Sequence, residues 1–219
     1  FEYSGVKKIE IPAGVTEIKE GTFKNSSLEN ITFLGNVTVI GQEAFSDTPL
    51  EAITANAVTE VGNNAFSNCS ELTDVNMPKL QTIGTKAFQY CTSLNTGMIW
   101  STELATIGKE AFKGCGLTSV DLSGITGEGI QIETKAFENC TKLKTIVLPA
   151  GLTGISTGVF KGCTSLKNVT LQENITVIGE EAFSGCTSLE TIVIPASVYK
   201  ILAKAFDGCE ALSTIRIEN

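Results

Sequence analysis

Histidine does not occur anywhere in this 219-residue sequence. The Ser-His-Asp and Cys-His arrangements of nucleophilic enzymes use an imidazole as the general base, so both are excluded. Histidine metal sites are excluded for the same reason, and the side chain best suited to titrate near neutral pH is missing. The composition therefore argues against an enzyme before any motif is considered.

Long hydrophobic runs and an excess of positive charge are also missing. No apolar stretch approaches the roughly 18 residues that a membrane-spanning helix needs, and no basic and apolar leader marks a signal peptide. The net charge of −8 disfavours nucleic acid as a partner, because an acidic surface repels phosphate. The plainer interpretation of this charge is that it keeps the protein in solution.

Phenylalanine reveals an internal repeat that runs through the whole chain. Of the 11 phenylalanines, only Phe33 lies outside a series in which neighbours are 21 to 25 residues apart. A period of this length is typical of leucine-rich repeats. The series is Phe1, Phe23, Phe45, Phe66, Phe88, Phe112, Phe137, Phe160, Phe183 and Phe206.

Other apolar columns keep the same register. An isoleucine or valine stands five residues before each phenylalanine from Phe23 onward, and a leucine or valine usually follows each phenylalanine after five or six residues. The leucine opens a segment L-x-x-I-x-I, whose alternating apolar residues predict a short half-buried strand. We expect ten strands, at 8–11, 30–33, 52–55, 74–77, 96–99, 119–122, 145–148, 168–171, 191–194 and 214–217.

The rest of each repeat is predicted to form a return path. The V-x-x-I-G segment is expected to be extended. The A-F-x-x-C segment is too short for a full helix and is predicted to form one helical or 3₁₀ turn. One repeat is too small to bury its own apolar face, whereas stacked repeats bury their Leu, Ile, Phe and Cys columns in one continuous core.

The combined pattern I-G-x-x-A-F-x-x-C-x-x-L-x-x-I-x-L-P resembles the BspA-type leucine-rich repeat, in nine to ten copies across residues 1–219. The resemblance implies a leucine-rich-repeat solenoid, a right-handed α/β superhelix of 21–25-residue repeats with a parallel sheet on its concave face. It also implies a secreted or cell-surface protein, in a family linked to adhesion, and no catalytic residues. We expect residues 1–219 to form a single domain. Because Phe1 occupies the phenylalanine position of a partial copy, we also expect this domain to be a fragment of a longer chain.

The seven cysteines form a column of their own, three residues after successive phenylalanines. Their spacing of 22 to 25 residues does not fit the close pairs of a metal site. Disulfides are a second possibility, although equivalent side chains in a stack point the same way and seven is an odd number. We favour a third, a ladder of reduced, buried thiols that pack as small hydrophobic groups. The expected core ladder is Phe23, Phe45, Phe66, Phe88, Phe112, Phe137, Phe160, Phe183, Phe206, Cys69, Cys91, Cys115, Cys140, Cys163, Cys186 and Cys209.

Alternate residues of each strand face away from the core. This outward face is mostly small and polar, and stacked threonines there are explained by cross-strand packing. Solenoids also use such faces for binding, so we predict a protein-binding surface where the polar pattern is broken. Its candidate residues, on the concave face, are Met98, Trp100, Asp121, Val147, Thr170 and Val193.

Trp100 is the one tryptophan of the chain and takes the position that proline holds after several other strands. Tryptophan is enriched among the residues that dominate protein interfaces. Our hypothesis is that Trp100 and Met98 together anchor a protein partner. The alternative is that Trp100 folds over the extra residue in its own loop.

The sequence therefore predicts a non-catalytic protein–protein interaction module, the adhesin-like domain of a secreted or cell-surface protein. The expected partner is an extracellular matrix protein or a protein on the surface of a host or other cell. A structural stalk that presents other domains is the alternative function. No catalytic, cofactor-binding or metal-binding residue is predicted, and neither is a nucleic-acid partner or a membrane span in this chain.

Overall fold

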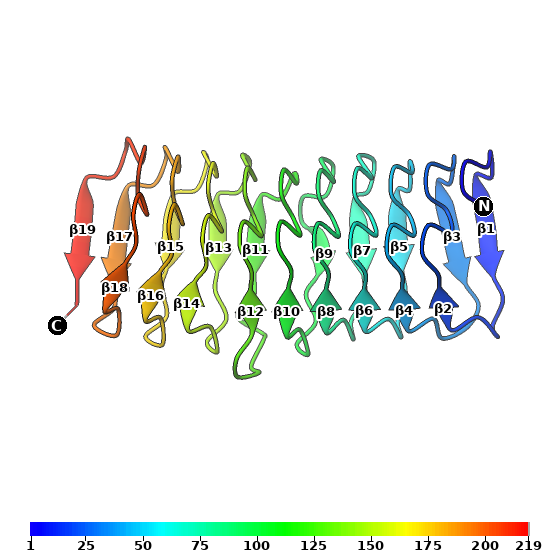
Figure 1. The fold of residues 1–219 in the computed structure, drawn as a ribbon, viewed down its shortest axis with the longest axis horizontal. Helices are drawn as coiled ribbons and strands as arrows, with labels where there is room; N and C mark the ends of the chain where they lie inside the picture. The colour runs from blue at the N-terminus through cyan, green and yellow to red at the C-terminus, as the bar shows by residue number, and fades with distance from the viewer. Residues whose placement is uncertain (219) are drawn as a thin grey trace.

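The computed structural model describes residues 1–218, which wind into coils that stand side by side in one row (Figure 1). Each coil contributes one strand of three or four residues, which we call a long strand. All ten long strands agree with the predicted ranges to within one residue at either end. They are β1 (Lys8–Ile11), β3 (Asn30–Phe33), β5 (Ala52–Thr54), β7 (Asp74–Asn76), β9 (Gly97–Ile99), β11 (Ser119–Asp121), β13 (Thr145–Val147), β15 (Asn168–Thr170), β17 (Thr191–Ile194) and β19 (Thr214–Ile217).

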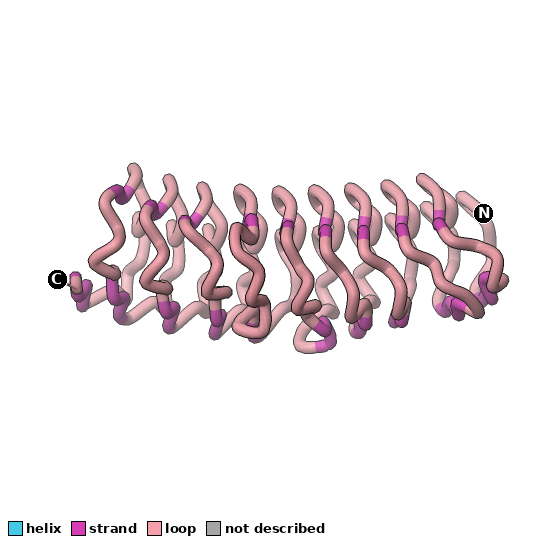
Figure 2. Tube along the Cα trace, turned by 90° about the horizontal axis from the view of Figure 1, so that it is seen from below, coloured by secondary structure: helices cyan, strands magenta, loops and turns pink. Residues whose placement is uncertain are grey.

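A second strand of two residues, which we call a short strand, lies on the return path where the sequence predicts extended chain. Figure 2 shows strands in two rows along opposite sides of the solenoid. The short strands are β2 (Glu17–Ile18), β4 (Val39–Ile40), β6 (Glu60–Val61), β8 (Thr82–Ile83), β10 (Thr106–Ile107), β12 (Gln131–Ile132), β14 (Gly154–Ile155), β16 (Val177–Ile178) and β18 (Lys200–Ile201).

Neighbouring coils pair in parallel, with equivalent residues side by side, as where Ile9 lies opposite Ile31. The long strands form three sheets, with the orders β1-β3, β5-β7-β9 and β11-β13-β15-β17-β19. The short strands form two, one from β2 to β12 and one of β14-β16-β18. The predicted parallel β-solenoid is therefore confirmed. The long-strand face is interrupted at two places and the short-strand face at one.

The phenylalanine column forms a stack of rings through the core. Neighbouring ring centroids are 5.1 to 5.9 Å apart, and the ring planes tilt by at most 23°. This spacing is close to the roughly 4.8 Å between paired strands, so one stacking distance serves both the rings and the backbone. The fully buried members are Phe23, Phe45, Phe66, Phe88, Phe112, Phe137, Phe160 and Phe183, and Phe206 is half-buried.

The turn around each phenylalanine is neither α-helical nor 3₁₀ within residues 1–218, so the predicted helical turn is wrong. Residues two positions before and two after the phenylalanine have left-handed backbone, as at Glu43 (φ 53°) and Asp47 (φ 57°) around Phe45. A right-handed helix cannot contain two left-handed residues four positions apart. The amides instead reach the next coil, where Phe45 N donates to the Ala65 oxygen at 2.8 Å. The turns thus form a further hydrogen-bonded ladder between coils.

Glycine at the start of this turn lets neighbouring coils approach closely. A Cβ atom on Gly108 would lie 2.7 Å from the carbonyl carbon of Gly84, and one on Gly84 would lie 2.7 Å from that of Gly62. Such a contact is too short for real atoms, so an added methyl group would push the coils apart. The amide of Gly108 meanwhile donates to the Ile83 oxygen at 2.8 Å, a bond that this displacement would weaken.

We expect Gly108→Ala to lower the free energy of unfolding by about 1–3 kcal/mol, the usual range for overpacking a tight site. Gly14→Ala is the matched control, because a Cβ at Gly14 meets nothing within 4 Å. The control should leave stability unchanged or raise it slightly. Urea unfolding followed by circular dichroism measures both variants, and equal stability of the two would contradict this account of the glycine.

Candidate functional site

The outward residues of the long strands line up in columns along the solenoid. In the second outward position, Asp121 of β11 lies opposite Val147 of β13. Thr170 of β15 lies between Val147 and Val193 of β17. All four side chains are exposed, including the two valines at 39% and 38%. The structure therefore places four of the six candidate residues in one unbroken line, which we call the recognition column.

Met98 and Trp100 do not lie on this face, which corrects their assignment as surface anchors. Strand β9 begins at Gly97, so Met98 lies opposite Val75, faces the core and is 7% exposed. Ile99 takes the outward position and is 51% exposed. The extra residue of this repeat precedes the strand instead of following it, and a shift by one residue turns every side chain of a strand to the other face.

Trp100 is half-buried and packs against the core. Its ring meets the ring of Phe112 edge-on, with centroids 5.3 Å apart and an angle of 63° between the planes. Edge-to-face contacts of this kind stabilise aromatic pairs by about 0.5–1.5 kcal/mol beyond the area they bury. Trp100 thus extends the phenylalanine stack sideways and is not available as an exposed anchor.

Ile99 is the outward residue that the sequence reasoning missed. The only signal was the extra residue between Leu94 and Ile107, and a residue count does not say on which side of the strand it falls. In the structure the strand opens at Gly97, three positions after Leu94, whereas β7 opens at Asp74, two positions after Leu72. The insertion therefore lies before β9, next to Thr96.

The electrostatics of the recognition column differ between its two ends. Hydrogen bonds from Ser123, including its amide to Asp121 Oδ1 at 2.9 Å, hold the pKa of Asp121 below its usual value. Asp121 is therefore anionic at neutral pH. At the other end, Arg216 of β19 lies opposite Val193 and carries a positive charge. The exposed valines of the column thus lie between an acid, Asp121, and a base, Arg216, which stands one coil beyond the column.

The cysteine column makes a repeated hydrogen bond between coils. Cys91 Sγ donates to the Phe66 oxygen of the preceding coil at 3.1 Å, while the Cys69 amide donates to the same oxygen at 3.2 Å. Each such carbonyl therefore accepts two bonds. The cysteines whose thiols make this contact are Cys69, Cys91, Cys115, Cys140, Cys163, Cys186 and Cys209. None of them is in a disulfide within residues 1–218.

Burial raises the pKa of six of these thiols, those of Cys69, Cys91, Cys140, Cys163, Cys186 and Cys209. Desolvation raises the pKa of the Cys69 thiol to about 11 and that of Cys163 to about 12. The pKa values of Cys91 and Cys140 are also raised by burial. A thiol must lose its proton to act as a nucleophile or metal ligand, so these cysteines are suited to packing and hydrogen bonding. Cys209 differs from the other six cysteines because its side chain is only half-buried.

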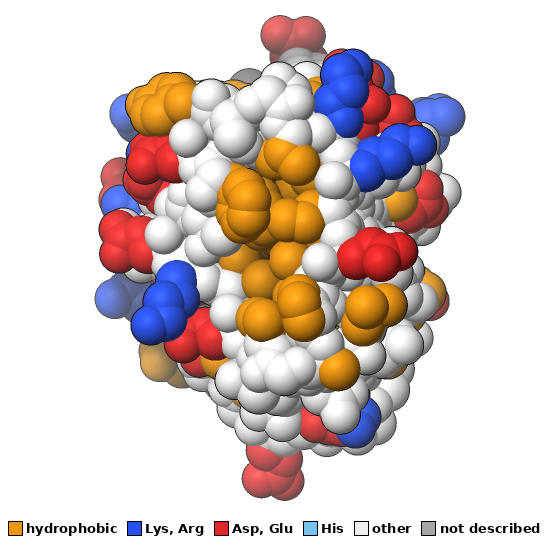
Figure 3. Space-filling view, turned by 90° about the vertical axis from the view of Figure 1, so that its right-hand side faces the viewer, with side chains coloured by type: hydrophobic (Ala, Val, Ile, Leu, Met, Phe, Trp, Pro, Cys, Tyr) orange, Lys and Arg blue, Asp and Glu red, His pale blue; other side chains and the backbone are white. Residues whose placement is uncertain are grey.

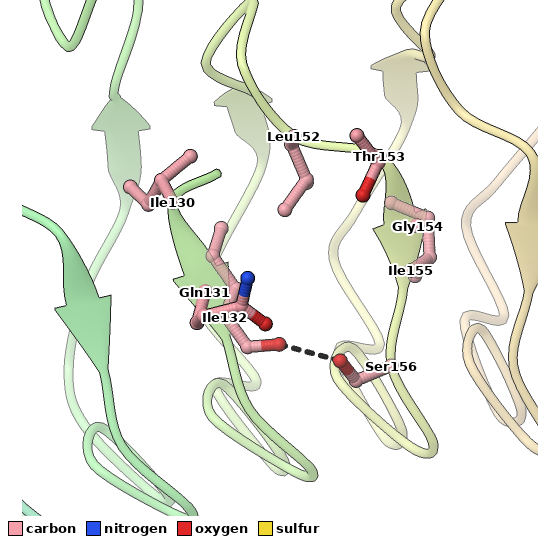
Figure 4. Close-up of a pocket in the computed structure, with 8 residues that line it drawn as sticks. All are labelled: Ile130, Gln131, Ile132, Leu152, Thr153, Gly154, Ile155 and Ser156. Carbon is pink, nitrogen blue, oxygen red and sulfur yellow. Dashed lines mark hydrogen bonds between the residues drawn. The ribbon is translucent and has the colours of Figure 1, made fainter. Parts of the chain in front are cut away.

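A notch of about 170 Å³ opens where the short-strand sheet is interrupted, between β12 and β14 (Figure 4). Here Ser156 takes the place that glycine holds in most coils, and its hydroxyl donates to the Ile132 oxygen at 2.6 Å. The phenylalanine rings of the two coils, Phe137 and Phe160, are also the most widely spaced pair, at 5.9 Å. The lining of the notch has no titratable side chain, so nothing there activates the hydroxyl. The notch reflects looser stacking of two coils.

A larger apolar hollow of about 560 Å³ lies at the N-terminal end of the row. Figure 3 looks onto this end and shows hydrophobic side chains gathered at its centre. They belong to the core columns seen end-on, and include Phe1, Ile9, Ile11, Val15 and Ile18. The hollow is therefore the cross-section of the core at the first coil.

Neither a metal site nor a membrane-spanning helix is found in residues 1–218. No group of three or more Cys, Asp or Glu side chains in this range is placed to hold a metal ion. No helix in the same range is long and apolar enough to cross a bilayer.

Comparison with known sequences identifies one protein family. The profile described as BspA type leucine rich repeat region matches residues 1–118 and 105–219, with six copies of its repeat. A search of curated proteins finds no match.

Solved structures show the same fold. A leucine rich cell surface protein from Faecalibacterium prausnitzii is 30% identical with a TM-score of 0.62, over 98% of this chain and 60% of that one. The pneumococcal vaccine antigen PcpA is 22% identical with a TM-score of 0.62, over 97% of this chain and 62% of that one. A leucine rich repeat protein of T. pallidum is 24% identical with a TM-score of 0.58, over 83% and 77%. This chain spans about three-fifths of the first two proteins, and the last two likenesses concern the fold alone.

Alkylation of the folded protein tests the burial of the thiols. We expect iodoacetamide at pH 8 to add about one label per chain, at Cys209, because the other six thiols are buried and cannot be reached by the reagent. Denaturation in guanidinium should expose all seven cysteines. Mass spectrometry of the intact and digested protein counts and locates the labels, and fast labelling at Cys91 or Cys140 in the folded state would contradict the structure.

Stability should also fall at alkaline pH because of these thiols. Unfolding returns their pKa from about 11 at Cys69 and about 12 at Cys163 towards 9.0. Between pH 9 and 11 the unfolded chain releases protons that the folded chain keeps. Each such thiol therefore lowers the free energy of unfolding by up to about 1.4 kcal/mol per pH unit, and has no effect well below pH 9.

Urea unfolding at pH 7.5, 9.0 and 10.0, with reductant present, measures this dependence. The control is Cys69→Ser with Cys163→Ser, in which hydroxyl groups can still donate to the carbonyls but do not titrate in this range. The variant should show a shallower loss of stability with pH than the parent protein. Identical slopes would mean that thiol ionisation does not contribute.

Proposed function

The chain belongs to the BspA-type leucine-rich repeat family, and we propose that it serves as a non-catalytic, adhesin-like protein-recognition module at a cell surface. The observation that carries the proposal is the recognition column, where Val147 and Val193 remain exposed on a sheet face that is mostly polar. The family's own columns, of Phe, Cys, Leu, Ile and Gly, are used in stacking. Recognition is therefore assigned to outward positions, where the repeats differ.

The site offers features that suit protein recognition. Its exposed valines can lose water on binding, and the neighbouring Asp121 and Thr170 offer a charge and a hydroxyl group. Interfaces typically combine such an apolar centre with a polar rim. The column lies on strands joined by backbone hydrogen bonds, so little conformational entropy is lost when a partner binds.

Location at a surface is supported by the family and by the relative from Faecalibacterium prausnitzii, which is described as a leucine rich cell surface protein. We propose an extracellular matrix protein, or a protein on another cell, as the partner. The chemistry of the site agrees with a protein more than with nucleic acid, since the net charge is −8. A purely structural stalk would leave the exposed valines without a role.

A binding assay with a panel of immobilised extracellular matrix proteins tests this function. We expect saturable binding by the parent chain, reduced at least ten-fold by the double substitution Val147→Glu with Val193→Glu. Thr32→Glu with Thr54→Glu is the matched control, because both threonines are exposed outward residues on β3 and β5. The control should bind as the parent does.

Two results would overturn the proposal. If no matrix protein binds saturably, the stalk is the better account of the chain. If both double variants bind equally well, recognition takes place elsewhere on the surface. Melting temperatures of the variants, followed by circular dichroism, show whether a loss of binding is a loss of folding.

A further inference from the structure

The dimensions and charges of the recognition column indicate what kind of partner lies on it. The column lies on paired parallel strands, which are about 4.8 Å apart. An α-helix rises about 5.4 Å per turn. A helix lying along the solenoid axis would therefore advance by about one coil with every turn.

The apolar residues of the column repeat with a matching period. Val147 and Val193 are two coils apart, with Thr170 between them. Two turns of a helix contain about seven residues and span roughly 10.5 Å. Apolar side chains seven residues apart on one face of a helix would thus stand over the two valines. An extended strand laid along the same direction repeats its side chains about every 6.7 Å, which does not fit two coils.

Charges at the ends of the column give this helix a direction. Asp121 stands one coil before Val147, and Arg216 stands one coil after Val193. A helix carries partial positive charge at its N-terminus and partial negative charge at its C-terminus. The column therefore suits a helix of about four turns whose N-terminus lies over Asp121 and whose C-terminus lies over Arg216. Arg216 contacts Glu218 only at 3.9 Å, in an exposed pair, and can still reach a partner.

Two lysines, each three residues before a member of the column on the same coil, add a further requirement. Lys144 and Lys167 directly precede β13 and β15, and both are exposed. Neither forms an ion pair with any residue in the range 1–218, although eight other ion-pair contacts are present there. They lie on neighbouring coils, so carboxylates one helical turn apart on one flank of the partner would meet them.

We infer that the recognition column binds an amphipathic α-helix of about 15 residues, laid parallel to the solenoid axis. The helix carries apolar residues seven positions apart towards Val147 and Val193 and acidic residues one turn apart towards Lys144 and Lys167. Its N-terminus lies at Asp121. This inference rests on the proposed function and names the structural class of its partner.

A designed peptide tests the inference directly. The probe is a fluorescein-labelled, alanine-based peptide of 16 residues, with leucines at its fifth and twelfth positions and glutamates at its sixth and tenth. We expect saturable binding by fluorescence anisotropy, weakened at least ten-fold by Val147→Glu with Val193→Glu. Thr32→Glu with Thr54→Glu should change the affinity by less than two-fold. Lys144→Ala with Lys167→Ala should weaken binding several-fold at low salt, and less at high salt.

Two control peptides distinguish specific binding of a helix from nonspecific hydrophobic binding. The first has the same composition with the leucines five residues apart, which places them on different sides of a helix. The second keeps the parent spacing but has two prolines in its centre, which prevent a helix. Both should bind at least ten-fold more weakly. Amide shift changes in a ¹⁵N spectrum should cluster along β11 to β19 and be absent at β3 and β5.

The outcomes distinguish this inference from the proposed function. If the proline peptide binds as well as the parent, with the same loss in the Val147 and Val193 variant, the column recognises extended chain and the helix is wrong. If the parent peptide does not bind while a matrix protein still binds through the valines, the helix is again wrong and the proposed function stands. If the valine substitutions affect neither ligand, both fail.

Discussion

The distance between neighbouring coils is set by parallel backbone hydrogen bonds, and every other contact in the solenoid has to fit it. The phenylalanine rings fit by stacking at 5.1 to 5.9 Å. The thiols fit by reaching back one coil, as Cys91 does to the Phe66 oxygen. Glycine fits where even a methyl group would collide, as at Gly108. One distance therefore limits each column to a few residue types, and this limit produces the repeat in the sequence.

The long strands could be predicted from sequence because ten copies report the same alternation of apolar and polar residues. The turns could not be predicted in the same way. Their left-handed residues include Glu43 and Lys86, and neither type favours that conformation by itself. Amides of these residues donate to the next coil, as Glu43 N does to the Asn63 oxygen at 2.9 Å. At these residues the turn is thus imposed by stacking, whereas in other copies glycine or asparagine, as at Gly158 and Asn139, favours the left-handed backbone by itself.

The outward residues could also be predicted only in part from the repeat pattern. Asp121, Val147 and Val193 were placed correctly on the outward face, because their strands keep a constant offset from the preceding leucine. The prediction failed at Met98, where one inserted residue reversed the two faces of β9 and exposed Ile99 instead. Periodicity assigns residues to a face of the sheet only where no residue is inserted or deleted in the repeat. It does not say what the face binds, since the columns that define the period are those used in stacking.

The interruptions of the sheets do not divide the solenoid into separate parts. The long-strand sheet is broken between β3 and β5 and between β9 and β11, but the short strands pair across both places. Between β12 and β14 the short-strand sheet is broken instead, and β13 remains paired with β11 and β15. Any two neighbouring coils are thus held by at least one sheet, so inserted residues are absorbed without dividing the solenoid. The recognition column lies within the five strands β11 to β19, the longest unbroken part of the long-strand face.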